Sequence, residues 1–174
     1  MFNLFSKKYS QEELNHFEFL STVRPFESLD NSELELFLPI MYLRNYNKDE
    51  VVFFNGDPSQ ALYIVKSGEI KLSIDVKGKT EDITNVIPGR AFGFNSFLKE
   101  TKRYFNAIVK SEGAEIFVLP RINISEILEN HHEVKAKVMS SMVEKYNYHT
   151  ENLFKAYSQN FGFFELNKIY ENPD

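Results

Sequence analysis

The sequence contains neither cysteine nor tryptophan among its 174 residues. The absence of cysteine excludes disulfides, cysteine-ligated zinc sites and thiol nucleophiles, and it suits a cytoplasmic protein. Because tryptophan is missing, 17 phenylalanines and 9 tyrosines must supply the large rings of the core. A chain of this length can bury a sizeable core, so we expect a single domain over residues 1–174.

Clustered positive charge and long apolar runs are also scarce. The formal net charge is −5 and the isoelectric point is near 5.5. Nucleic-acid-binding proteins usually present a basic face, so we expect no direct contact with nucleic acid. No apolar run approaches the roughly 20 residues that cross a bilayer, and we therefore expect no association with a membrane.

The segment 10–41 carries the start signals of helices. Ser10 with Glu13, and Asp30 with Glu33, form capping-box patterns ahead of apolar residues at helical spacing. No chemistry is implied by these residues. We expect the helices to support the segment that follows.

Between residues 42 and 120 the pattern changes to short apolar runs separated by turn residues. The predicted strands are 51–54, 61–65, 70–76, 83–87, 104–109 and 114–119. Many short strands at regular spacing are typical of a sandwich or a closed barrel, including jelly rolls. The predicted fold class is α+β, mainly β: an antiparallel β-roll or jelly-roll barrel flanked by N-terminal helices and a long C-terminal helix.

Residues 121–174 return to a helical pattern. Asn123 with Glu126 predicts the cap of a short helix, and a longer helix is expected from about residue 132 to 158. About 27 helical residues reach roughly 40 Å, which exceeds the length of the barrel. This helix carries a broad apolar stripe that must be buried. We expect it to form a homodimer, with packing along its own barrel as the alternative. The residues assigned to this dimer helix are Val138, Met142, Tyr146 and Leu153.

The tail from residue 161 to residue 170 is strongly apolar, with four aromatic residues. In water it would form an exposed hydrophobic patch. It either folds back on its own chain, crosses to a partner subunit, or serves as a docking site for another protein.

Two blocks of sequence resemble a known family. Residues 56–69 contain Gly56 and Asp57, then a run of four large apolar residues, then Gly68; residues 87–93 end in Ala-Phe-Gly. With the helix–roll–helix layout, these blocks resemble the cyclic-nucleotide-binding domain family, which includes the bacterial Crp/Fnr-type regulators. Regulators of that type carry a helix-turn-helix domain after the long helix. Only about 16 residues follow Ser158 here, so we expect no such domain.

The resemblance implies a ligand pocket beside Gly93. A short helix beginning near Asn95 and Ser96 would point free N–H groups into the roll, where an anion can bind. In nucleotide-binding members of the family, the glycine matching Gly93 is followed by a glutamate that binds the ribose 2′-hydroxyl. This chain has Phe94 at that position.

The second charged position of the family is an arginine that pairs with the cyclic phosphate. It is followed by Thr or Ser, then Ala, a variable residue and Val. Aligning Ala107 and Val109 with that Ala and Val places Asn106 at the Thr position and Phe105 at the arginine. Alternation supports this register, since Phe105, Ala107 and Val109 share one strand face. A register shifted by one residue puts Tyr104 there, which also supplies no arginine.

Arg103 lies two residues before Phe105, on the same face if the strand begins that early. It could reach the pocket and meet an anion together with the amides of Asn95 and Ser96. Because it belongs to the charged segment 99–103, however, we expect it to be a solvated loop residue. The rings of Phe94 and Phe105 then predict a pocket that is hydrophobic or filled by its own side chains.

No catalytic constellation stands out. The histidines, which are His16, His131, His132 and His149, all fall in predicted helices or at their ends, so no metal site and no cofactor is expected. The sequence predicts a non-enzymatic regulatory module with a degenerate pocket that acts through dimerisation and protein contacts. The alternatives are a sensor of cyclic nucleotide or another small anion that uses Arg103, a transcription regulator with a separate DNA-binding chain, and a cupin-type metal enzyme.

Overall fold

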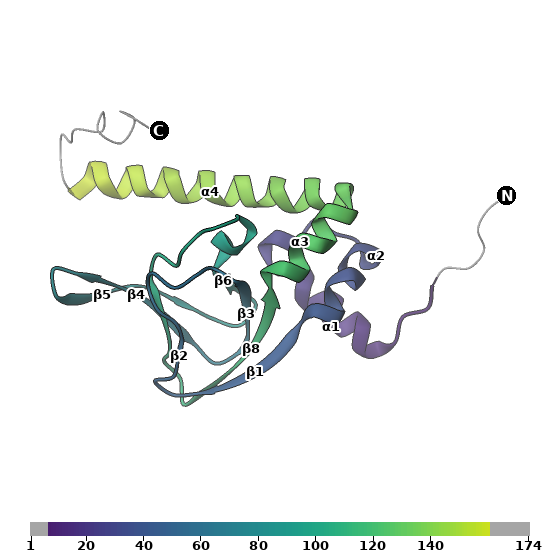
Figure 1. The fold of residues 1–174 in the computed structure, drawn as a ribbon, viewed down its shortest axis with the longest axis horizontal. Coiled ribbons are helices and arrows are strands. Elements are labelled where there is room, and N and C mark those ends of the chain that lie inside the picture. Colours follow the sequence, from purple (N-terminus) through teal and green to yellow (C-terminus); the bar gives the residue numbers. More distant parts are fainter. Residues whose placement is uncertain (1–6, 161–174) are drawn as a thin grey trace.

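The computed structural model describes residues 7–160, and it consists of a β-roll that packs against helices on one side (Figure 1). The apolar tail at 161–170 lies outside the described residues. The strands are β1 Tyr42–Asn47, β2 Val51–Phe53, β3 Ala61–Ser67, β4 Ile70–Val76, β5 Lys79–Val86, β6 Ala91–Phe92, β7 Asn106–Val109 and β8 Gly113–Pro120. The helices are α1 Gln11–Ser21, α2 Asn31–Leu34, α3 Arg121–Asn130 and α4 His132–Asn160, with short 3₁₀ turns η1 Arg24–Phe26, η2 Glu35–Ile40 and η3 Phe94–Phe97.

The roll is made of two four-stranded antiparallel sheets. Their strand orders are β1-β8-β3-β6 and β2-β7-β4-β5. The predicted fold class is confirmed. The sequence did not predict β1 as a strand. Its side chains are mostly exposed, so it has no apolar run of its own.

Strand β3 explains why the sequence carries an uninterrupted apolar run from Leu62 to Val65. Leu62 and Ile64 pack into a cluster with the helices, whereas Val65 packs inside the roll, with Tyr63 against it. Successive strand residues point to opposite faces, so a strand covered on both faces must be apolar throughout. The run therefore marks the layer between the two cores.

The N-terminal helices begin where the sequence predicts. Ser10 and Glu13 form a capping box at α1, and Asp30 and Glu33 form another at α2. The predicted cap at Asn123 is wrong, because α3 starts at Arg121 directly after strand β8. The last strand runs straight into the helix, which leaves no loop for a cap.

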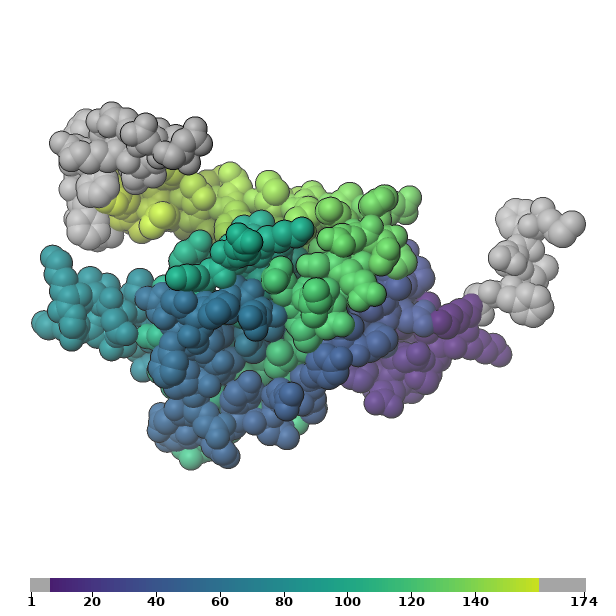
Figure 2. Space-filling model, viewed as in Figure 1, coloured from purple at the N-terminus to yellow at the C-terminus, as the bar shows by residue number. Residues whose placement is uncertain are grey.

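Helix α4 passes over the helical cluster and continues along the side of the roll (Figure 1). In its first half, Val138 is fully buried and Met142 is nearly so, within their own chain. These two residues are therefore not free to form the dimer surface assigned to them, because the stripe covers the chain's own core at this end. In the second half, Tyr146 is 46% exposed and Leu153 is 70% exposed. Figure 2 shows this half of α4 at the same end of the molecule as the β4–β5 hairpin.

Among the described residues, none of the helices combines the length and the apolar character that a bilayer crossing requires.

Candidate functional site

The Arg103 guanidinium lies inside the roll, and the expectation of a solvated loop residue is wrong. The side chain is only 2% exposed. Its Nη2 donates to the Ala61 carbonyl oxygen at 2.8 Å. Its Nη1 donates to the carbonyl oxygen of Gly93 at 3.2 Å and to Asn95 Oδ1 at 3.3 Å.

The backbone of Arg103 is fixed by the first motif block. The Arg103 amide donates to the Asp57 carbonyl at 2.8 Å, and the Gly56 amide donates to the Arg103 carbonyl at 2.9 Å. Gly56 has a φ of +87°, a conformation that favours glycine. These pairings hold the end of a charged loop against the roll, so that its last side chain turns inward.

Aromatic rings surround the guanidinium. Its Cζ lies 4.2 Å from the ring centroid of Phe53 and 5.3 Å from that of Tyr63. Phe53 also packs at 5.8 Å from Phe92 and at 5.8 Å from Phe105, measured between ring centroids. Cation–π attraction compensates part of the cost of burying the charge.

The charge of Arg103 has no carboxylate partner within residues 7–160. Burial lowers its pKa, and this is opposed first by Tyr63 and then by Asp57. The Asp57 carboxylate instead accepts the Phe54 amide at 2.8 Å. A buried cation that meets only neutral oxygens keeps most of its desolvation cost.

Arg103 Nε is buried without a hydrogen-bond partner, and so is Ser96 Oγ in the η3 turn that Arg103 contacts. Ser96 is fully buried in η3, directly after Asn95. The Asn95 side chain is already engaged, because it accepts from Ser59 Oγ at 2.8 Å as well as from Arg103. One free donor and one free hydroxyl in a buried site are unusual, since most buried polar atoms are paired.

Phe94 and Phe105 do not meet. Phe105 packs against the cluster inside the roll, whereas Phe94 packs against the cluster of the helices. The Phe94 ring lies under α4, with Lys145 Nζ at 3.8 Å from its centroid. The prediction that both rings fill one pocket is therefore wrong. Phe94 is the first residue of η3, and its ring points out of the roll toward the helices.

The predicted alternation is confirmed, since Phe105, Ala107 and Val109 share the inward face. Ala107 and Val109 are fully buried inside the roll with Phe105 against them, and Tyr104 is 67% exposed. Asn106 points away from Arg103. Its Oδ1 accepts the Asn55 amide and its Nδ2 donates to Asp75, so it ties β7 to its neighbours rather than lining the site.

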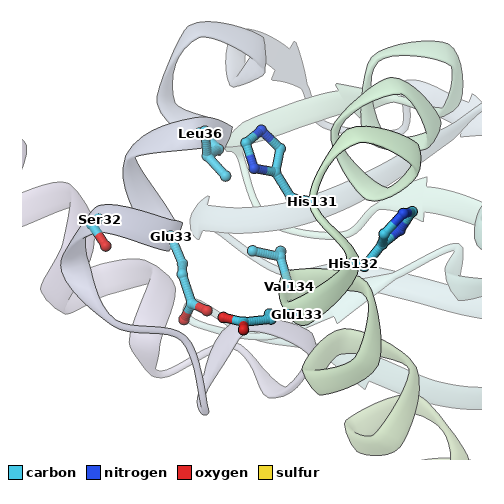
Figure 3. Close-up of a pocket in the computed structure, with 7 residues that line it drawn as sticks. All are labelled: Ser32, Glu33, Leu36, His131, His132, Glu133 and Val134. Atoms are coloured by element: carbon cyan, nitrogen blue, oxygen red, sulfur yellow. The ribbon is translucent and has the colours of Figure 1, made fainter.

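A separate surface pocket of about 330 Å³ lies where α3 meets α4 (Figure 3). Its two histidines, His131 and His132, point in different directions in that view. Both carboxylate oxygens of Glu33 are taken by Lys137 at 2.7 Å. Residues 7–160 contain no group of three or more acidic or histidine side chains that could hold a metal.

The sequence identified Arg103 as a candidate anion ligand but placed it wrongly in a solvated loop. It did not identify Phe53, Tyr63 and Phe92 as part of the site. These rings come from three separate strands. Within each strand, the alternation of side chains can indicate that the ring faces inward. It does not reveal that the three rings surround a cation.

Comparison with known proteins identifies the family and supports the fold. Residues 43–131, which make up half of the chain, match the sequence model of a family described as "Cyclic nucleotide-binding domain". The chain belongs to this family. It is 33% identical over 97 residues to the cyclic AMP receptor protein of Thermus thermophilus, a match that covers 55% of this chain and 44% of that protein.

Two further relatives show the same domain in other contexts. The cGMP-dependent protein kinase egl-4 of Caenorhabditis elegans is 25% identical over 112 residues, covering 63% of this chain and 14% of the kinase. The regulatory domain of Toxoplasma gondii PKA, solved with cAMP, superposes with a TM-score of 0.63 at 26% identity, covering 70% of this chain and 46% of that chain. The chain thus spans less than half of each of these relatives.

Proposed function

We propose that this chain is a non-enzymatic regulatory module whose roll binds a small phosphate-bearing anion through Arg103. The observation that carries the proposal is the buried guanidinium, which finds no carboxylate partner in the described part of the chain and has one unpartnered nitrogen, Nε. An anion at Nε would neutralise the charge and occupy the free donor. Charge-assisted hydrogen bonds of this kind are about twice as strong as neutral ones.

The ligand class follows from the family and from the missing glutamate. The Toxoplasma relative was solved with cAMP, so a cyclic nucleotide is the first ligand to test. Phe94 supplies no carboxylate for a ribose hydroxyl and lies under Lys145. Recognition would therefore rest on the phosphate group, with Ser96 Oγ as a second donor, and discrimination between sugars would be weak.

A second candidate function is a silent module, in which Arg103 permanently fills the pocket. The dense ring contacts around Phe53, at 5.5 to 5.8 Å from Tyr63, Phe92 and Phe105, favour it. In that case the module would act only through dimerisation and protein contacts.

In both candidates the chain forms a homodimer through the second half of α4. The dimer would act in the cytoplasm and would bind neither nucleic acid nor a membrane. Tyr146, Leu153 and Phe154 are each at least 37% exposed on this half. A paired helix is the simplest cover for such a face.

Calorimetric titration separates the two candidates. The titrants are cyclic AMP and cyclic GMP, and the variants are Arg103→Gln and Lys102→Gln. Lys102 is the matched control, because it is an exposed cation in the same segment. Saturable binding that is lost in Arg103→Gln and kept in Lys102→Gln supports the anion sensor. Absence of binding to the wild type, or binding that survives in Arg103→Gln, contradicts it.

A further inference from the structure

Basic residues from three distant segments lie close enough beneath α4 for their charges to act on one another. Ser141 of α4 donates its hydroxyl to the carbonyl oxygen of Arg24 in η1. Lys145 and His149 follow Ser141 at intervals of four residues, so they lie on the same face of the helix. A lysine in a helix extends back toward the N-terminus, which directs Lys145 toward Arg24.

The third segment is the turn that contains Arg90. A β-carbon added to Gly89 would lie 3.4 Å from Thr22 Oγ1, so this turn rests against the end of α1, two residues before Arg24. The Arg90 amide donates to the Ile87 carbonyl at 3.1 Å, which closes the turn. Arg24, Arg90 and Lys145, together with His149, form what we call the α4 basic cluster.

Phe94 forms the floor of the α4 basic cluster. Lys145 Nζ lies 3.8 Å from the centroid of the Phe94 ring, and its side chain is half-buried. The family's glutamate would stand at this position. Because Phe94 stands there, the group beside the Lys145 ammonium is an uncharged ring and supplies no carboxylate.

The cluster has more positive than negative charge. Its one carboxylate contact within residues 7–160 is that of Glu27 with Arg24 Nε, at 3.6 Å. That nitrogen is buried and makes no hydrogen bond. Burial, then Arg24 and Arg90, lower the pKa of Lys145 to about 8. Burial, Lys145 and Arg24 also lower the pKa of His149. Cations that repel one another are stabilised when an anion binds between them.

We propose that the α4 basic cluster is a second anion site, which takes the phosphate group of a small phosphorylated molecule. Arg24 and Arg90 can bind phosphate oxygens through their guanidinium donors, and Lys145 supplies a point charge. A phosphate dianion matches this excess of positive charge better than a carboxylate does. The site joins η1, η3 and α4, so its occupation would hold the long helix against the roll. It does not depend on Arg103.

Inorganic phosphate is the probe, titrated at constant ionic strength. The readout is the side-chain NMR resonance of Lys145, followed against pH with and without phosphate, and the affinity is measured by calorimetry. We expect phosphate to raise the pKa of Lys145 from about 8. Removing one charge-assisted contact in Lys145→Gln or Arg90→Gln should weaken binding about tenfold or more.

Lys155→Gln is the matched control, because Lys155 is exposed on the same helix away from the cluster. It should change the affinity less than about twofold, as expected for a screened surface charge. Arg103→Gln separates this site from the roll and should leave the shift of Lys145 intact. The proposal is overturned if phosphate leaves the Lys145 resonance unmoved, if Lys155→Gln weakens binding as much as Lys145→Gln, or if Arg103→Gln abolishes the shift.

Discussion

Arg103 Nη1 donates to the carbonyl oxygen of Gly93 at 3.2 Å and fills the space where a side chain at position 93 would begin. A β-carbon there would lie 2.5 Å from Nη1, and Gly93 has a φ of +82°. Gly93→Ala should therefore lower the free energy of unfolding by about 2–4 kcal/mol, of which about 1–2 kcal/mol is the left-handed backbone. Urea denaturation measures the change.

Gly78→Ala is the control for this prediction, because Gly78 has a φ of +79° and no atom within 4 Å of an added β-carbon. It carries the backbone cost without the contact. Gly93→Ala should also weaken anion binding, since it displaces the guanidinium. Equal destabilisation by the two substitutions would mean that Arg103 does not occupy this space.

Phe105→Arg places an arginine at the position that we aligned with the family's arginine, and it introduces a second cation into the ring cluster around Arg103. Since two unpaired charges then share an apolar interior, we expect the free energy of unfolding to fall by about 3 kcal/mol or more. The double variant Arg103→Met with Phe105→Arg should recover part of that loss, with a coupling of about 1–3 kcal/mol in a double-mutant cycle. Additive effects would show that the two side chains do not compete for one place.

Lys145 should make the protein more stable as the pH rises above 8. Its pKa is about 8 in the folded state against an ordinary value of 10.5. Between these values the unfolded chain binds more protons, so stability increases with pH by at most about 1.4 kcal/mol per pH unit. Below pH 8 the cost of burying the charge is fully present.

The comparison with Lys145→Met isolates this contribution from other groups. Burial raises the pKa of Tyr63 and of Tyr146, which acts in the opposite direction over part of the same range. Denaturant unfolding at pH 7, 8, 9 and 10 should give a shallower or more negative slope for the variant. Parallel curves for the two proteins would contradict the assignment.

Leu153→Glu should dissociate the proposed dimer without changing the stability of the subunit, because this side chain is 70% exposed within its own chain. Analytical ultracentrifugation measures the mass. Val138→Glu is the contrasting variant. It buries a charge in the core and should destabilise the fold by about 3–5 kcal/mol. A wild-type protein that sediments as a monomer would rule out the dimer.

The fold could be predicted because the signals that determine it are local. Gly56, Gly68 and Gly93 all adopt positive φ angles, and their spacing is visible in the sequence. The position of Arg103 depends instead on backbone hydrogen bonds to Gly56 and Asp57, more than 40 residues away along the chain. The charged composition of segment 99–103 suggested that Arg103 lies in a solvated loop. The alternation of strand residues, counted back from Phe105, placed it on the inward face instead.

The long helix shows a second limit of sequence patterns. Its apolar stripe predicts that one face is buried, but it does not identify what covers that face. Val138 is covered by its own chain, and Leu153 is not. The sequence shows that residue 94 is a phenylalanine, but it does not show the contact of Phe94 with Lys145. That contact forms only because α4 packs over η3 in the folded chain.

The nitrogen resonance of Arg103 Nε tests the central claim most directly, because the claim concerns the free donor at this atom. The Nε–Hε signal is assigned by its loss in Arg103→Lys, and cyclic AMP is then added in steps. An anion bound at Nε should move the signal downfield and slow its exchange with water, with saturation. A signal that stays unmoved, whether or not the nucleotide binds elsewhere on the protein, would contradict the account.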